Sequence, residues 1–110
     1  MTVNEIYQGI GQAISDAIPE DWAFAVLKIE RGDGMVGYTG TYTDNVGQEK
    51  ELDMWTFSYN TDYVNELHAI TTEGGSNRWN RLYFKLYPTG KFEMDFVWDQ
   101  EREDRVKANS

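Results

Sequence analysis

Residues 82–99, LYFKLYPTGKFEMDFVWD, constrain the fold more than any other part of the chain. Large apolar residues alternate with polar ones on both sides of PTG, and this alternation is typical of two half-buried strands. Pro88 suits the first position of a tight turn, and Gly90 suits a left-handed position. The stretch therefore predicts a β-hairpin with a three-residue turn in which Tyr87 pairs with Lys91.

This register sorts the hairpin side chains onto an apolar face and a polar face. The predicted pairs on the apolar face are Leu86 with Phe92, Phe84 with Met94, and Leu82 with Phe96. Those on the polar face are Lys85 with Glu93 and Tyr83 with Asp95. We expect Phe84, Met94 and Phe96 to form the heart of the core. The polar face is either solvated surface or a contact surface, because tyrosines supply apolar area and a hydroxyl with little loss of entropy.

The rest of the chain predicts two helices and three strands. Isoleucines recur at helical spacing over residues 3–18, Thr2 and Glu5 have the spacing of a capping box, and Pro19 ends the helix. Strands are expected at residues 22–30, 35–44 and 51–59, with a turn at residues 31–34 and a polar loop at residues 45–50, and a second helix near residues 62–73. The predicted class is α+β, with an antiparallel sheet of about five strands, an N-terminal helix, and a second helix before a C-terminal hairpin.

The chain has the size and apolar content of one domain. Its 110 residues are 40% hydrophobic and 15% aromatic, which is enough to close a single core. We assign residues 1–99 to this domain and residues 100–110 to a charged tail, either a frayed helix or disordered. No basic leader and no run approaching about 18 apolar residues is present, so we expect a soluble, cytoplasmic protein with no membrane partner.

The charge of the chain limits its partners. There are 19 acidic and 10 basic residues, giving a formal net charge of −9. This surplus argues against direct binding of a nucleic acid and favours a cationic partner, or serves only to keep the protein soluble.

Catalytic motifs are missing from the sequence. The chain has no cysteine, and its single histidine, His68, lies in the predicted second helix without a second histidine for a metal site. We therefore predict no enzyme, no cofactor and no metal. The four tryptophans are expected in the core or at its edge: Trp22, Trp55, Trp79 and Trp98. The rival interpretation is that they line a small-ligand pocket between the sheet and the helices.

Two segments carry a family resemblance. The leading helix ending in IPEDW and the terminal hairpin LYFKLYPTGKFEMDFVWD resemble the YezG-like immunity proteins, bacterial antitoxins that neutralise toxins of polymorphic and contact-dependent systems. The resemblance implies an α+β fold with an antiparallel sheet and a cognate toxin as partner. It also implies that the toxin is a nuclease, since the known toxins of the family are largely nucleases. A nuclease cleft is normally basic because it binds phosphate, so an acidic protein could cover it.

Two acidic and aromatic surfaces are candidates for toxin binding. The first runs along the polar face of the hairpin and into the tail: Tyr83, Tyr87, Glu93, Asp95, Asp99, Glu101 and Glu103. The alternative surface lies in the middle of the chain: Asp44, Glu49, Glu51, Asp53 and Trp55. The sequence leaves open which surface binds, which toxin is bound, and the oligomeric state. A carrier or sensor of a small ligand remains the alternative function.

Overall fold

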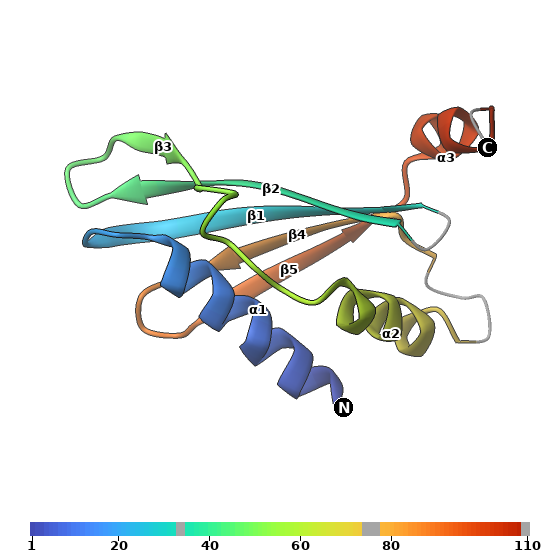
Figure 1. The fold of residues 1–110 in the computed structure, drawn as a ribbon, viewed down its shortest axis with the longest axis horizontal. Helices are drawn as coiled ribbons and strands as arrows, with labels where there is room; N and C mark the ends of the chain where they lie inside the picture. Colours follow the sequence, from blue (N-terminus) through green and yellow to red (C-terminus); the bar gives the residue numbers. More distant parts are fainter. Residues whose placement is uncertain (33–34, 74–77, 109–110) are drawn as a thin grey trace.

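The protein folds around one antiparallel sheet of five strands, in a computed structural model that describes residues 1–32, 35–73 and 78–108 (Figure 1). The elements in chain order are α1 (Val3–Ala17), β1 (Trp22–Gly32), β2 (Met35–Asp44), β3 (Glu49–Glu51), α2 (Thr61–Thr71), β4 (Arg81–Leu86), β5 (Phe92–Val97) and α3 (Gln100–Ala108). The strand order across the sheet is β3-β2-β1-β4-β5. The predicted α+β class is confirmed, whereas the predicted turn at residues 31–34 lies partly outside the described residues.

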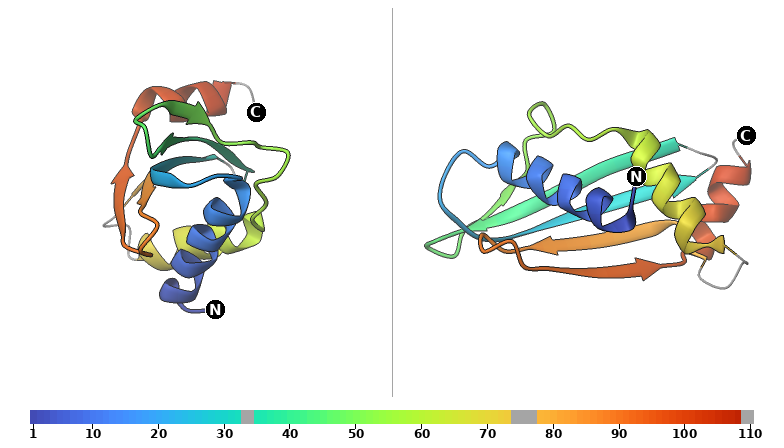
Figure 2. Two further views of the ribbon diagram at one scale, coloured as in Figure 1. Left: turned by 90° about the vertical axis from the view of Figure 1, so that its left-hand side faces the viewer. Right: turned by 90° about the horizontal axis from the view of Figure 1, so that it is seen from below.

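Helices cover the two faces of the sheet unequally. In Figures 1 and 2, α1 and α2 lie side by side across one face, while α3 sits at one end of the opposite face. We call the face under α1 and α2 the helix face and the other the open face. The arrangement leaves most of the open face without a covering helix among the residues that the structure describes.

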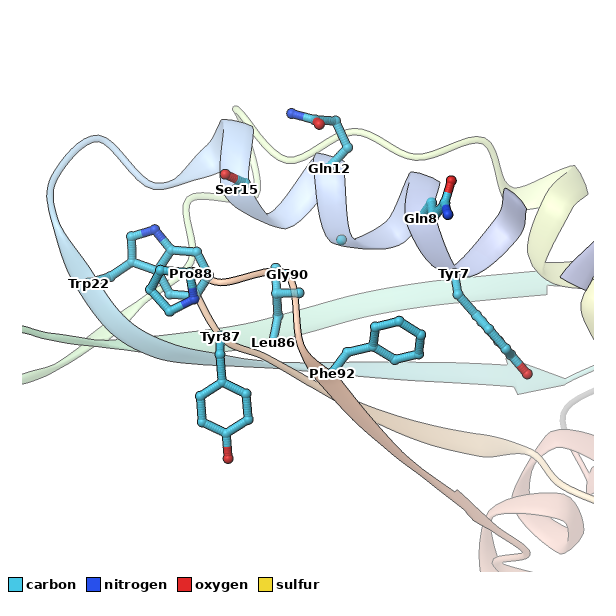
Figure 3. A pocket seen from close by; sticks show the side chains of 11 residues that line it. Tyr7, Gln8, Gln12, Ser15, Trp22, Leu86, Tyr87, Pro88, Gly90 and Phe92 are labelled. Atoms are coloured by element: carbon cyan, nitrogen blue, oxygen red, sulfur yellow. The ribbon is translucent and has the colours of Figure 1, made fainter. Parts of the chain in front are cut away.

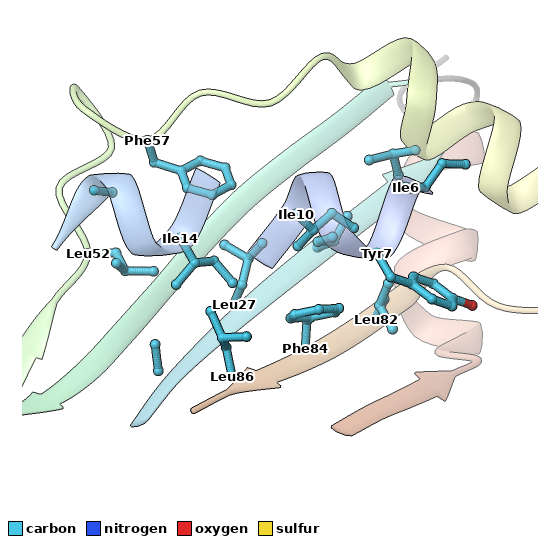
Figure 4. Close-up of a cluster of buried hydrophobic side chains, with 14 of the residues drawn as sticks. Ile6, Tyr7, Ile10, Ile14, Leu27, Leu52, Phe57, Leu82, Phe84 and Leu86 are labelled. Atoms are coloured by element: carbon cyan, nitrogen blue, oxygen red, sulfur yellow. The ribbon is translucent and has the colours of Figure 1, made fainter. Parts of the chain in front are cut away.

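The core lies between α1, α2 and the helix face (Figure 4). α1 begins with the predicted capping box, in which the Glu5 backbone N–H donates to Thr2 Oγ1 at 3.2 Å and the Thr2 N–H donates to the Glu5 carboxylate at 3.0 Å. Its isoleucine stripe then packs on the central strands. The largest fully buried side chains are Trp79, Phe84, Ile6, Ile10, Ile14, Leu27, Ile29, Leu67, Leu82 and Val64.

The terminal hairpin has the predicted register throughout. The Tyr87 N–H donates to the Lys91 carbonyl at 2.9 Å, and the Gly90 N–H donates to the Tyr87 carbonyl at 2.9 Å. Gly90 has a φ of +90°, as a left-handed turn position requires. All five predicted cross-strand pairs are observed.

The predicted heart of the core is wrong in two of its three residues. Phe84 is fully buried, but Met94 is only partly buried and Phe96 is 38% exposed. The reason is that β5 is an edge strand, so its apolar side chains have neighbours on one flank only. α1 and α2 lie over the inner strands and leave the outer flank of β5 uncovered (Figure 2).

The third strand was predicted too long and too late. It spans Glu49–Glu51 only, and the chain then leaves the sheet in a turn. Asp53 closes that turn, because its carboxylate accepts bonds from the Trp55 N–H at 2.9 Å and the Thr56 hydroxyl at 2.8 Å. Trp55 is consequently 99% exposed, so its expected place in the core is wrong, whereas Trp79 is buried as expected.

The charged C-terminal segment forms a helix over most of its length. α3 has no buried residue, yet it contacts β1, because Val106 lies against Gly32, where an added Cβ would come within 3.1 Å of its side chain. The sequence left this segment open between a frayed helix and disorder, and the structure therefore adds one helix to the predicted order of elements.

Candidate interaction surface

The open face is built from alternate residues of all five strands. The register places Val26 and Lys28 of β1 beside Thr39 and Thr41 of β2 on one side and beside Tyr83 and Lys85 of β4 on the other. Glu93 and Asp95 of β5 face Lys85 and Tyr83, and Glu49 and Glu51 of β3 face Thr43 and Thr41. One continuous surface therefore runs from β3 to β5.

Strand residues of both candidate surfaces lie on this face, at its opposite margins. Glu93 and Asp95 stand along its β5 margin, and Glu49 and Glu51 stand along its β3 margin. All four carboxylates are exposed. Period-two alternation predicted that each strip has a polar side, but the sequence carried no signal for the strand order that places both strips on the same side of the sheet.

The middle of the open face is apolar and partly basic. The Lys85 ammonium lies 4.6 Å from the centre of the Phe24 ring and 5.4 Å from that of Tyr87. Lys28 Nζ lies 3.4 Å from a Glu30 carboxylate oxygen. A shallow hollow of about 380 Å³ opens between the two margins and is lined by Val26, Lys28, Thr39, Gly40, Thr41, Glu51, Leu52, Met54 and Tyr83. A partner would thus meet aromatic and aliphatic groups between two acidic margins.

Asp99 has intramolecular partners at the α3 end of the face. Its carboxylate accepts the Arg102 N–H at 3.2 Å and lies 3.1 Å from the Arg81 guanidinium. The Arg102 N–H and, to a lesser degree, the Arg81 charge lower the pKa of Asp99. Arg81 and Arg102 also pair with Glu30, at 3.2 and 3.3 Å. Asp99 therefore ties α3 to β4 and is less available to a partner than its place in the sequence suggested.

The other two acidic residues predicted in the tail differ in exposure. Glu101 is exposed on α3. Glu103 is half-buried and lies 3.4 Å from Lys107 one helical turn away. Tyr83 and Tyr87 are likewise half-buried, and Tyr83 lines the hollow on the open face. Of the first predicted surface, the structure brings Tyr83, Glu93 and Asp95 closest together.

The members of the second surface also have different roles. Asp44 is only 6% exposed, and its carboxylate accepts bonds from the backbone N–H groups of Gln48 at 2.9 Å and Val46 at 3.0 Å. The Gln48 bond is the main cause of its lowered pKa. Asp53 is held in the turn before Trp55, and the bond from the Thr56 hydroxyl is the main cause of the lowered pKa of Asp53. Asp44 and Asp53 shape loops, whereas Trp55 projects into solvent.

A groove on the helix side bears on the ligand-binding alternative. It has a volume of about 390 Å³, lies between α1 and the hairpin turn, and is lined among others by Tyr7, Trp22 and Phe92 (Figure 3). Trp79 and Trp98 line a different hollow, of about 550 Å³. The tryptophans therefore do not share one pocket, although aromatic residues do line the groove.

His68 lies in α2, as predicted, and is half-buried. Its Nε2 donates to the Trp79 carbonyl at 3.0 Å, and its ring lies against the Trp79 ring. Burial and then the Arg31 charge lower the pKa of His68. Within the described parts of the chain, no three histidine or carboxylate side chains are grouped closely enough to hold a metal ion. The described helices include none with the length and apolar content to cross a bilayer.

The match to a protein family covers nearly all of this architecture. A family model described as immunity protein YezG-like matches residues 3–109. The chain belongs to the YezG-like immunity protein family. A search of curated proteins finds no match. Membership confirms the resemblance seen in the two terminal segments, and it implies that this immunity protein has a cognate toxin as its partner.

Proposed function

We propose that this immunity protein neutralises a nuclease toxin in the cytoplasm by covering a basic surface of the toxin with its open sheet face. The observation that carries the proposal is the pair of acidic margins, Glu49 with Glu51 and Glu93 with Asp95, on the same open face. A nuclease concentrates positive charge where it binds phosphate, so a face bordered by carboxylates is complementary to it.

The groups between the margins suit a protein partner. Tyr83 and Tyr87 offer large rings and a hydroxyl, and such residues supply much of the binding energy at protein interfaces. Met54, which is 39% exposed, lines the hollow beside the β3 margin and adds to this apolar area. An enzyme is not part of the proposal, because the function follows from occupying a surface and needs no reacting group.

Charge reversal on the two margins tests the proposal. The variants are Glu93→Lys/Asp95→Lys and Glu49→Lys/Glu51→Lys, and each reverses two exposed carboxylates on an edge strand of the sheet. For the toxin domain, the assay uses the C-terminal domain of a toxin encoded next to the immunity gene. Each double variant is first checked for wild-type melting and then assayed for protection of cells that express this domain.

We expect the Glu93/Asp95 reversal to abolish protection and the Glu49/Glu51 reversal to weaken it. Among single variants, Tyr83→Ala or Asp95→Ala should weaken binding by more than about tenfold, as central interface residues do, while Glu103→Lys should slow association only modestly. Full protection by both double variants would show that the open face does not bind the toxin.

The groove beneath α1 favours a second candidate, a carrier or sensor of a small ligand. It is lined by aromatic side chains and the polar Gln8 and Gln12 (Figure 3). A metabolite that raises the melting temperature of the wild type without toxin, but not that of Gln8→Trp, would support this alternative. If no metabolite of a panel raises the melting temperature, the small-ligand alternative is rejected and the toxin stays the proposed ligand.

A further inference from the structure

The outer edge of β5 carries hydrogen-bonding groups in a defined order. The bond from the Tyr87 N–H to the Lys91 carbonyl fixes the phase of the β4–β5 ladder. Glu93 and Asp95 therefore direct their backbone groups toward Lys85 and Tyr83, in register with them. The N–H and C=O groups of Phe92, Met94 and Phe96 point away from the sheet, because successive residues of a strand alternate in direction.

The side chains along this edge are apolar and held in place. Phe92 and Phe96 are each 38% exposed on the helix side of β5. The Phe92 ring stacks on Phe84 at a centroid distance of 5.2 Å and also contacts Tyr7 at 5.8 Å. Phe96 packs against the buried Trp79 at 5.2 Å. Ring contacts with the core thus fix an exposed apolar row beside a backbone edge that has no partner strand among the described residues.

The opposite side of the same strand is acidic. Glu93 and Asp95 alternate with the apolar row and project onto the open face. A strand added at this edge would place its own side chains within about 5 Å of theirs, on alternating sides. Apolar residues would suit the side of Phe92, Met94 and Phe96, and lysines or arginines would suit the side of Glu93 and Asp95.

We propose that the toxin contributes an extended strand with alternating basic and apolar residues, which pairs with β5 and continues the sheet. This inference rests on the proposed function and specifies how the toxin is bound. The added strand extends the open face, so that the basic side chains of the toxin stand next to the β5 margin. Main-chain bonds give such a contact its affinity, and the alternating side chains give it specificity.

A second copy of the protein fits the same edge less well. In the antiparallel register that sets Phe92 against Phe96 of the other copy, Glu93 of each chain would face Asp95 of its neighbour. Like charges directly opposite each other destabilise a strand pair. A basic strand has no such conflict, so charge complementarity favours the toxin over self-association.

Amide hydrogen exchange, followed by NMR, tests the inference at the atoms concerned. The sample is the full immunity protein, alone and saturated with a catalytically inactivated form of the toxin domain encoded beside its gene. In the protein alone, Phe92, Met94 and Phe96 should exchange faster than Glu93 and Asp95. In the complex, exchange at these three amides should slow at least about tenfold, which would make all five slow.

A matched pair of variants isolates one backbone group. Met94→Ala removes the side chain and keeps the outward N–H, whereas Met94→Pro also removes the N–H without touching the bonds to β4. We expect Met94→Pro to bind the toxin domain at least about tenfold more weakly than Met94→Ala, as the loss of one hydrogen bond and a steric block predict. If Met94→Pro does not fold, the exchange measurement on the wild type decides.

Each other outcome counts against the inference. A saturated complex with fast exchange at Phe92, Met94 and Phe96 would overturn strand addition and leave the proposed function standing. Slow exchange at these amides in the protein alone, together with a dimer in sedimentation, would assign the edge to a second copy. Failure to form any complex would overturn the proposed function and the inference together.

Discussion

Phe84 and Phe96 lie on the same side of neighbouring strands, yet only Phe84 is fully buried. Alternation in the sequence assigned both residues to the apolar side correctly, because it reports direction relative to the strand. Alternation could not report how deeply each ring is buried, since burial depends on which strand lies at the edge of the sheet. At the scale of single residues, the side was predictable and the depth was not.

Truncation of the two phenylalanines should therefore differ in cost. We expect Phe84→Ala to lower the free energy of unfolding by about 3 to 5 kcal/mol, as for a fully buried ring. Phe96→Ala should cost only about 1 to 2 kcal/mol, because part of its ring already contacts water and collapse into the gap is easier. Urea denaturation of both variants beside the wild type measures the difference, and equal losses would contradict the assigned depths.

The acidic residues show the same limit on prediction. Asp99 and Asp44 were chosen for their charge, but each accepts backbone N–H bonds close by in the chain. Aspartate is favoured at turns and at helix starts, so the local role of these two residues could have been predicted from the sequence. Glu93 and Asp95 stand on a strand, where a carboxylate has no such local role, and they remain the better candidates for contact.

Among the elements, the cross-strand pairs of the hairpin were predicted correctly, whereas the bounds of β3 were not. The β4–β5 register depends on a turn of three residues, and Pro88 and Gly90 favour the conformation of that turn. β3 pairs with β2 over three residues only, and its end is determined by the turn at Asp53 and by Leu52 entering the core. Local geometry can be derived from sequence more reliably than the point where a strand ends for tertiary reasons.

Substitution of Gly90 tests the turn. Gly90 has a φ of +90° and open space where a Cβ would stand, while Gly37 in β2 has open space and no positive φ. We expect Gly90→Ala to lower the free energy of unfolding by about 1 kcal/mol or more, because alanine is strained at that φ. Gly37→Ala is the control and should be neutral or mildly stabilising. Similar melting temperatures for the two variants would argue against a left-handed turn position.

For the whole molecule, the class of fold was predictable and the arrangement of its surface was not. The sequence indicates an antiparallel sheet with two helices, but the order β3-β2-β1-β4-β5 arises from pairings between segments far apart in the chain. That order brings the two predicted acidic strips together on one face. The place of α3, on the face opposite α1 and α2, also depends on long-range contacts, namely Val106 with Gly32 and Arg102 with Glu30.

The surplus of nine negative charges predicts how the rate of association with the toxin depends on salt. Association with a basic toxin domain should be steered by charge, so the association rate constant should fall steeply between low and physiological salt. The dissociation rate constant should change far less. Stopped-flow mixing over a salt series measures both, with Glu93→Gln/Asp95→Gln as a variant whose salt dependence should be weaker. A rate constant that does not respond to salt would contradict a charge-complementary interface.

The sheet has two outer edges, and this has a consequence for the protein at high concentration. If β5 of one copy joined β3 of the next, the joint could repeat without closing and a filament would grow. Each such joint would rest on a strand of three residues and would bring Glu49 and Glu51 beside Glu93 and Asp95 on a shared face. Like charges at both ends of the sheet therefore oppose polymerisation, while the β5 edge stays open to a strand of opposite charge.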